Sequence, residues 1–191
     1  MSYTTYITDA LVCGSRDSNT SDRSYLLFSR EAGMVYATAR SVREERSKQR
    51  YALQEFSHVR ATLVRGKGGW RIAGVEPIGN MYFDTEDRYT RKMVRSIVTL
   101  LRRVVQGDTP HESLFDDVMA SLAASSRCDI EALELLLSVR ILRELGYVAP
   151  RPAYADILDR THAYEGAAEL TPEQKKYCLE AIDHALHSSQ L

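Results

Sequence analysis

Residues 25–40 read YLLFSREAGMVYATAR, and this stretch decides the fold of the first half of the chain. Two runs rich in aromatic and apolar residues flank Arg30-Glu31-Ala32-Gly33, whose glycine can adopt the positive φ of a tight turn. In the second run Val35, Ala37 and Ala39 occupy alternate positions, which is the period of a strand with one buried face. The stretch therefore predicts a β-hairpin.

Further strand-like segments lie on both sides of this hairpin. They are rich in Thr, Tyr, Ile and Val, which favour a pleated, half-buried surface. Short turns separate them, a polar one at residues 14–19 and a glycine-rich one at Gly66-Lys67-Gly68-Gly69. The predicted strands cover residues 3–12, 25–29, 34–40, 57–65 and 70–77. This spacing predicts a small five-stranded antiparallel barrel in residues 1–80, and the pattern alone leaves open an OB-fold or an SH3-like barrel.

From residue 84 onward the apolar residues follow a helical period instead. The signals for helix ends in this half are N-cap candidates at Thr85-Glu86-Asp87 and Asp129, a glycine suited to a helix C-terminus and a Thr-Pro-Glu-Gln capping box. The predicted helices begin at Thr85-Glu86-Asp87, at Pro110, at Asp129 and at Thr171; the first ends near Gly107, the third at Gly146 and the last near His187. Because the helices follow the strands as a block, we expect an α+β chain with a helical domain at residues 81–191.

The charge of the chain is divided unevenly. Residues 1–80 hold 12 Lys/Arg and 8 Asp/Glu, whereas residues 111–191 hold 7 and 14, although the whole chain has a formal net charge of only −1. Such asymmetry favours a polyanionic partner for the front half. Uneven surface composition without any partner is the alternative.

The densest basic stretch runs from Arg40 to Arg71, and basic groups on one groove are what phosphate binding needs. OB-folds add aromatic side chains on which bases stack. The predicted outer face of residues 34–40 carries a tyrosine, a threonine and an arginine, and the only tryptophan follows the glycine-rich turn. The candidate DNA-binding residues are Tyr36, Thr38, Arg40, Arg43, Arg46, Lys48, Arg50, Arg65, Lys67, Trp70 and Arg71.

Each candidate also has a purely structural interpretation. Residues 40–50 are expected to form an exposed loop or a short solvated helix, and this segment can be a solvated face with internal Glu–Arg pairs and no ligand. Tyr36 can pack against a neighbouring strand, and Trp70 can anchor the rim of the barrel. Asp116-Asp117 is expected to lie on a helix surface rather than at a metal site.

Neither a cofactor nor catalytic machinery is expected. Cys13, Cys128 and Cys178 lack the short spacing of zinc ligands, so we predict no structural metal. The chain shows no Walker loop, nucleophile elbow, His-Glu-x-x-His or dinucleotide fingerprint. No apolar run approaches the roughly 18 residues of a membrane span, and the N-terminus shows no secretory signal. We expect a non-enzymatic cytoplasmic protein that makes no membrane contact.

Several motifs resemble the RecO family of bacterial recombination mediators. Residues 21–33 are similar to that family's first hairpin, and Ala39-Arg40-Ser41-Val42-Arg43 is similar to its basic loop. Leu53-Gln54-Glu55-Phe56 resembles the segment that leads into the fourth strand. Leu142-Arg143-Glu144-Leu145-Gly146-Tyr147, followed by Pro150, resembles the family's characteristic helix end.

This resemblance implies an N-terminal OB-fold followed by a helical domain. It also implies binding of single- and double-stranded DNA, strand annealing, and assistance in loading RecA, with RecR and single-stranded-DNA-binding protein as partners. Many members carry a four-cysteine zinc site in the C-terminal part, which this sequence lacks, so we expect a short variant without zinc. The alternative function is a protein-interaction scaffold whose degenerate barrel no longer binds DNA.

Overall fold

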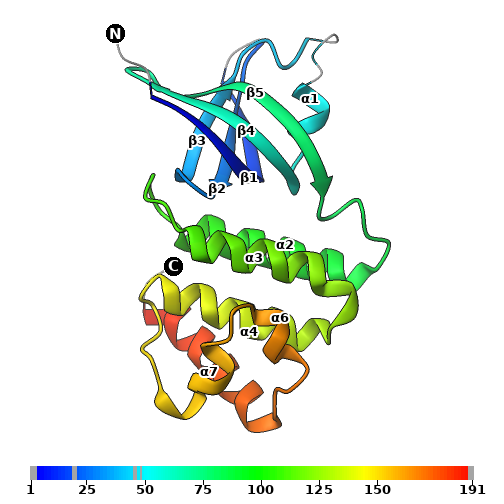
Figure 1. Cartoon of the computed structure of the whole chain (residues 1–191), viewed down its shortest axis with the longest axis vertical. Coiled ribbons are helices and arrows are strands. Elements are labelled where there is room, and N and C mark those ends of the chain that lie inside the picture. The colour runs from blue at the N-terminus through cyan, green and yellow to red at the C-terminus, as the bar shows by residue number, and fades with distance from the viewer. Residues whose placement is uncertain (1–3, 19–20, 45–46, 48, 189–191) are drawn as a thin grey trace. The chain divides into compact units, whose positions relative to one another are not determined.

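The structure is a computed structural model that describes residues 4–18, 21–44, 47 and 49–188. The chain divides into two compact units. The first comprises Met1–Glu86 and Gln106–Glu112, and the second comprises Asp87–Val105 and Ser113–Leu191. The first unit carries the strands, and the second is helical (Figure 1).

Five strands close into a barrel in the order β1-β2-β3-β5-β4 (Figure 1). All neighbouring strands pair antiparallel except β3 and β5, which pair parallel and close the barrel. A five-stranded barrel with this order is an OB-fold, which confirms the α+β class and settles the choice between the two barrels. The strands are β1 (Thr4–Asp17), β2 (Arg23–Ser29), β3 (Gly33–Ala39), β4 (Ser57–Gly66) and β5 (Gly69–Asn80).

The barrel interior is filled by the residues that alternate along the strands. Val35, Ala37 and Ala39 of β3 are buried in this core, whereas Tyr36 between them is exposed. The hairpin between β2 and β3 turns at Gly33, whose φ of 66° lies in the left-handed region that favours glycine. The predicted hairpin and its inward face are therefore confirmed.

Two predictions about loops in this unit were wrong. The polar turn expected at residues 14–19 begins later, because a β-bulge between Val12 and Gly14 lets β1 continue to Asp17. Residues 40–50 were expected to be an exposed loop or a short solvated helix, but the side chain of Val42 is buried in the barrel core. A short helix, α1 (Gln49–Ala52), follows the part of that loop in which residues 45, 46 and 48 are not described.

The helical unit is built around one buried helix. α4 packs against α2, α6 and α7 and buries residues on most of its sides. Asp87 and Asp129 accept hydrogen bonds from the first-turn amides of α2 and α4, and Thr171 with Gln174 forms the predicted capping box of α7. The sequence did not indicate α5 and α6. The helices are α2 (Arg88–Val104), α3 (Glu112–Ala124), α4 (Ile130–Glu144), α5 (Ala155–Leu158), α6 (Ala163–Ala167) and α7 (Pro172–Ser188).

A buried ion pair ties α3 to α4. Asp117 was expected on a helix surface, but it is only 5% exposed, and its carboxylate lies 2.7 Å from Nε of Arg140. The guanidinium also donates to the carbonyl oxygens of residues 158, 160 and 161. The second oxygen of the carboxylate accepts the backbone amide of Ala163 at 2.7 Å. The pair thus fixes the segment that enters α6.

Candidate nucleic-acid interface

Barrel closure places a continuous row of polar side chains on the outer surface. Arg16 of β1 pairs with Ser24 of β2, Ser24 pairs with Thr38 of β3, and Thr38 pairs with Arg71 of β5. The hydroxyl oxygens of Ser24 and Thr38 lie 3.0 Å apart and form a hydrogen bond. Because residues opposite each other in a sheet share a face, all four side chains lie on the outer side of the barrel, where Arg16 and Arg71 are exposed and Ser24 is buried. We call these four residues the polar row.

One aromatic ring stands beside the polar row. Tyr36 is 45% exposed, and the guanidinium carbon of Arg16 lies 4.0 Å from the centroid of its ring. This is a cation–π contact that joins β1 to β3 across β2. The result is a flat cationic platform, formed by a tyrosine ring and a guanidinium plane, of the kind on which a nucleobase stacks.

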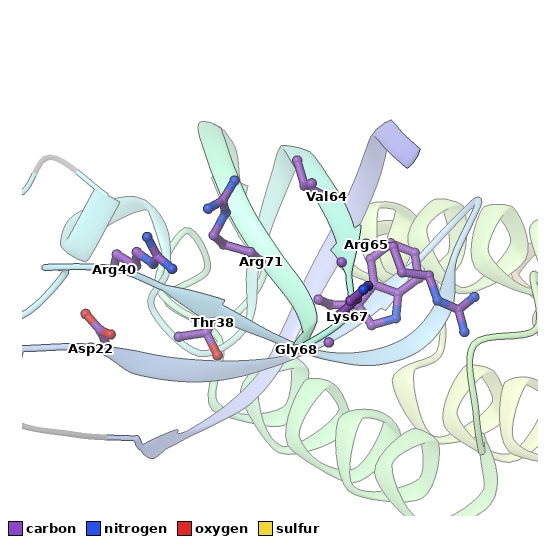
Figure 2. Close-up of a pocket in the computed structure, with 11 residues that line it drawn as sticks. Asp22, Thr38, Arg40, Val64, Arg65, Lys67, Gly68 and Arg71 are labelled. Carbon is purple, nitrogen blue, oxygen red and sulfur yellow. The ribbon is translucent and has the colours of Figure 1, made fainter. Parts of the chain in front are cut away.

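Next to the row the surface is hollowed (Figure 2). The hollow has a volume of about 560 Å³. Arg40 and Asp22 lie at one end of it, Lys67 and Arg65 lie at the other, and Arg71 lies between them (Figure 2). Its lining is Asp22, Thr38, Arg40, Val64, Arg65, Gly66, Lys67, Gly68, Gly69, Trp70 and Arg71.

The charge of the lining is positive, with four basic side chains and one carboxylate. Within the described part of the chain, Arg40, Lys67 and Arg71 form no ion pair. Arg65 forms an ion pair, because its guanidinium lies 2.8 Å from the carboxylate of Asp108. Three cations therefore remain available to an anion that enters the hollow.

The wall formed by the β4–β5 turn is backbone-rich. Gly66 pairs with Gly69, so the hairpin turn that the sequence placed at residues 66–69 is a two-residue turn of Lys67 and Gly68. Gly69 has φ 99°, which other residues rarely adopt, and a Cβ at Gly68 or Gly69 would meet no atom within 4 Å. The open space beside these glycines lets a ligand approach the backbone closely.

Trp70 has two environments. One is the barrel core, where its ring lies against Tyr6 with centroids 5.3 Å apart. The other is the hollow, where its ring lies 5.4 Å from the guanidinium carbon of Arg65. The residue thus acts as a packing anchor whose partly exposed side faces the hollow.

The structure brings together some of the residues proposed from the sequence and not others. Thr38, Arg40, Arg65, Lys67, Trp70 and Arg71 line the hollow, and Tyr36 stands beside the polar row. Arg43 lies 3.8 Å from the carboxylate of Asp17, and Arg50 is an exposed residue of α1. Arg46 and Lys48 lie outside the described residues.

The sequence-based reasoning missed Arg16. It was assigned to a polar turn, whereas the structure places it in β1 opposite Ser24. The signal that could have found it is Gly14, which directly follows the bulge and after which strand alternation resumes.

The comparisons with known proteins agree with this barrel. Residues 1–81 match the family model described as "Recombination protein O N terminal". The chain is 31% identical over 142 residues to the DNA repair protein RecO of Desulfitobacterium hafniense (strain DSM 10664 / DCB-2), which covers 74% of this chain and 52% of that protein. This chain belongs to the RecO family.

Other RecO proteins match at similar levels. The DNA repair protein RecO of Pelotomaculum thermopropionicum is 27% identical over 162 residues, which cover 85% of this chain and 60% of that protein. The one from Myxococcus xanthus is 31% identical over 111 residues, or 58% of this chain and 46% of that protein. The chain thus spans about half to three-fifths of the length of the RecO proteins it matches.

The described residues of this RecO family member contain no group of three or more His, Cys, Asp or Glu that could hold a metal ion. Burial raises the pKa of the Cys128 thiol, and it raises the pKa of Cys178 to about 11. Both thiols are therefore protonated at neutral pH. Across the same described ranges, no helix has both the length and the apolar character needed to cross a membrane.

Proposed function

We propose that this chain is a non-enzymatic DNA-repair and recombination mediator that binds DNA through the polar row and the adjoining hollow. In this proposal residues 1–80 are the nucleic-acid-binding domain and residues 81–191 are a RecO-like C-terminal domain. The observation that carries the proposal is the set of three cations, Arg40, Lys67 and Arg71, in one hollow next to the stack of Arg16 on Tyr36. That combination supplies both phosphate contacts and a stacking platform.

The geometry favours single strands as the primary ligand. Exposed bases can stack on Tyr36 or on the guanidinium of Arg16 only when they are not enclosed in a duplex. The backbone of the same strand would follow the cations of the hollow. Double-stranded DNA would use the phosphate contacts alone, because a base cannot reach the platform from within the stack.

Strand annealing follows from the same contacts without covalent chemistry. Two complementary strands repel one another through their phosphates, and a cationic surface screens that repulsion. Annealing additionally requires that bases remain free to pair. An open platform such as Tyr36, which is not enclosed in a pocket, allows this.

The proposed cellular role comes from the family. We propose that the chain acts in the cytoplasm, where it helps load RecA on strands coated by single-stranded-DNA-binding protein, together with RecR. The names of the relatives, DNA repair protein RecO, support a role in repair. A protein-interaction scaffold with a degenerate barrel is the competing function, and it needs none of the cations in the hollow.

Titration of a labelled single-stranded oligothymidylate at two salt concentrations tests the proposal. Three or four phosphate contacts predict that affinity falls by roughly 20- to 50-fold between about 50 mM and about 200 mM salt. Fluorescence anisotropy measures both affinities. No binding at the lower salt, or binding that salt does not weaken, would favour the scaffold.

A further inference from the structure

One cation of the hollow is already paired with a carboxylate of the chain itself. Arg65 lies 2.8 Å from Asp108, which belongs to the segment Gln106–Glu112 of the barrel-containing unit. A carboxylate and a phosphate diester are both oxyanions that accept hydrogen bonds from a guanidinium, so they compete for the same donor.

The position of Asp108 is fixed by its neighbours. The backbone amide of Met34 donates to the carbonyl oxygen of Gly107 at 2.9 Å. A Cβ at Gly33 would lie 2.3 Å from the carbonyl oxygen of Thr109, so only a glycine at the β2–β3 turn allows this approach. The segment is therefore held against the turn by its backbone, and Asp108 is presented to Arg65.

A second ion pair anchors the same segment, but its residues do not line the hollow. Glu112 lies 2.8 Å from Arg30, which follows β2 and does not line the hollow. The segment thus carries two carboxylates of equal charge, of which only Asp108 pairs with a residue of the proposed DNA surface. This difference provides a matched pair of variants.

We propose that Asp108 is an internal competitor of phosphate at Arg65, which lowers the affinity of the interface for DNA. The proposal rests on the proposed function and concerns the regulation of that same surface. A DNA strand must displace the carboxylate to contact Arg65. Because one anion replaces another, the contact releases few counterions and contributes little to the salt dependence of binding.

Asp108→Asn tests the proposal. The variant is expected to bind oligothymidylate between about twofold and tenfold more tightly at about 50 mM salt, and to steepen the plot of log affinity against log salt by roughly 0.7. Glu112→Gln removes the same charge from the same segment and is expected to change affinity by less than about twofold. Both pairs are solvent-exposed, so thermal unfolding is expected to show that both variants are folded.

A double-mutant cycle tests whether Asp108 acts on DNA binding through Arg65. Arg65→Ala is expected to weaken binding little in the wild-type background and distinctly more in the Asp108→Asn background, because the competitor is then absent. Equal gains from Asp108→Asn and Glu112→Gln would overturn the proposal and indicate long-range electrostatics, and so would no gain from Asp108→Asn. If neither the wild-type protein nor any variant binds DNA, the proposed function itself fails.

Discussion

Arg140→Ala is expected to lower the free energy of unfolding by about 3–5 kcal/mol, the largest stability loss we expect from a single substitution in the helical unit. The variant leaves the buried carboxylate of Asp117 without its compensating charge. It also removes the donor that holds the carbonyl oxygens of Leu158, Arg160 and Thr161. The main cost is at Asp117, which is only 5% exposed and then lies buried without a charged partner.

Urea unfolding followed by circular dichroism measures this loss. Lys176→Ala is the control, because the pair of Lys176 with Glu180 is exposed and 3.9 Å long, and its loss is expected to cost about 0.5 kcal/mol or less. Asp117→Asn keeps the side-chain shape but leaves Arg140 charged, and it is expected to be strongly destabilising as well. An Arg140→Ala variant within about 1 kcal/mol of the wild type would show that the network contributes little.

The largest effect on binding is expected from removing the three cations of the hollow together. Replacing Arg40, Lys67 and Arg71 by alanine removes about three phosphate contacts and is expected to lower the salt slope by about 2. Affinity is expected to fall by on the order of tenfold per contact at low salt, equally for all base sequences. Anisotropy titration across a salt series measures both quantities.

A second basic surface provides the control for this prediction. Lys92, Arg95 and Arg103 are exposed residues of α2, and their replacement by alanine makes the same change in net charge. A much smaller loss of affinity is expected for this control. If both triple variants lose affinity and salt slope equally, DNA is not bound specifically at the barrel surface.

Local sequence patterns predicted the barrel well because its strands obey the rule of alternation. Val35, Ala37 and Ala39 had to face the core, and this placed Tyr36 and Thr38 outside. The hairpin between β4 and β5 followed from the glycine-rich turn at residues 66–69 in the same way. These features depend on neighbours within a few residues.

The features that sequence reasoning missed depend on residues far apart in the chain. Arg16 reaches Tyr36 only through the bulge between Val12 and Gly14 and the pairing of three strands. Asp117 pairs with Arg140, which lies 23 residues later in the chain and on another helix. Spacing patterns within one helix or strand carry no information on such partners, because the tertiary fold brings them together.

In the proposed complex, DNA lies on the polar row and in the hollow beside it. Photo-crosslinking of single-stranded DNA that contains a photoreactive thymidine analogue, followed by mass-spectrometric mapping of the crosslinked peptides, tests this most directly. The account predicts crosslinks in the peptides that carry Tyr36 and Trp70, and it predicts that salt which abolishes binding also abolishes them. Crosslinks confined to residues 113–188, obtained under conditions in which DNA is bound, would contradict it.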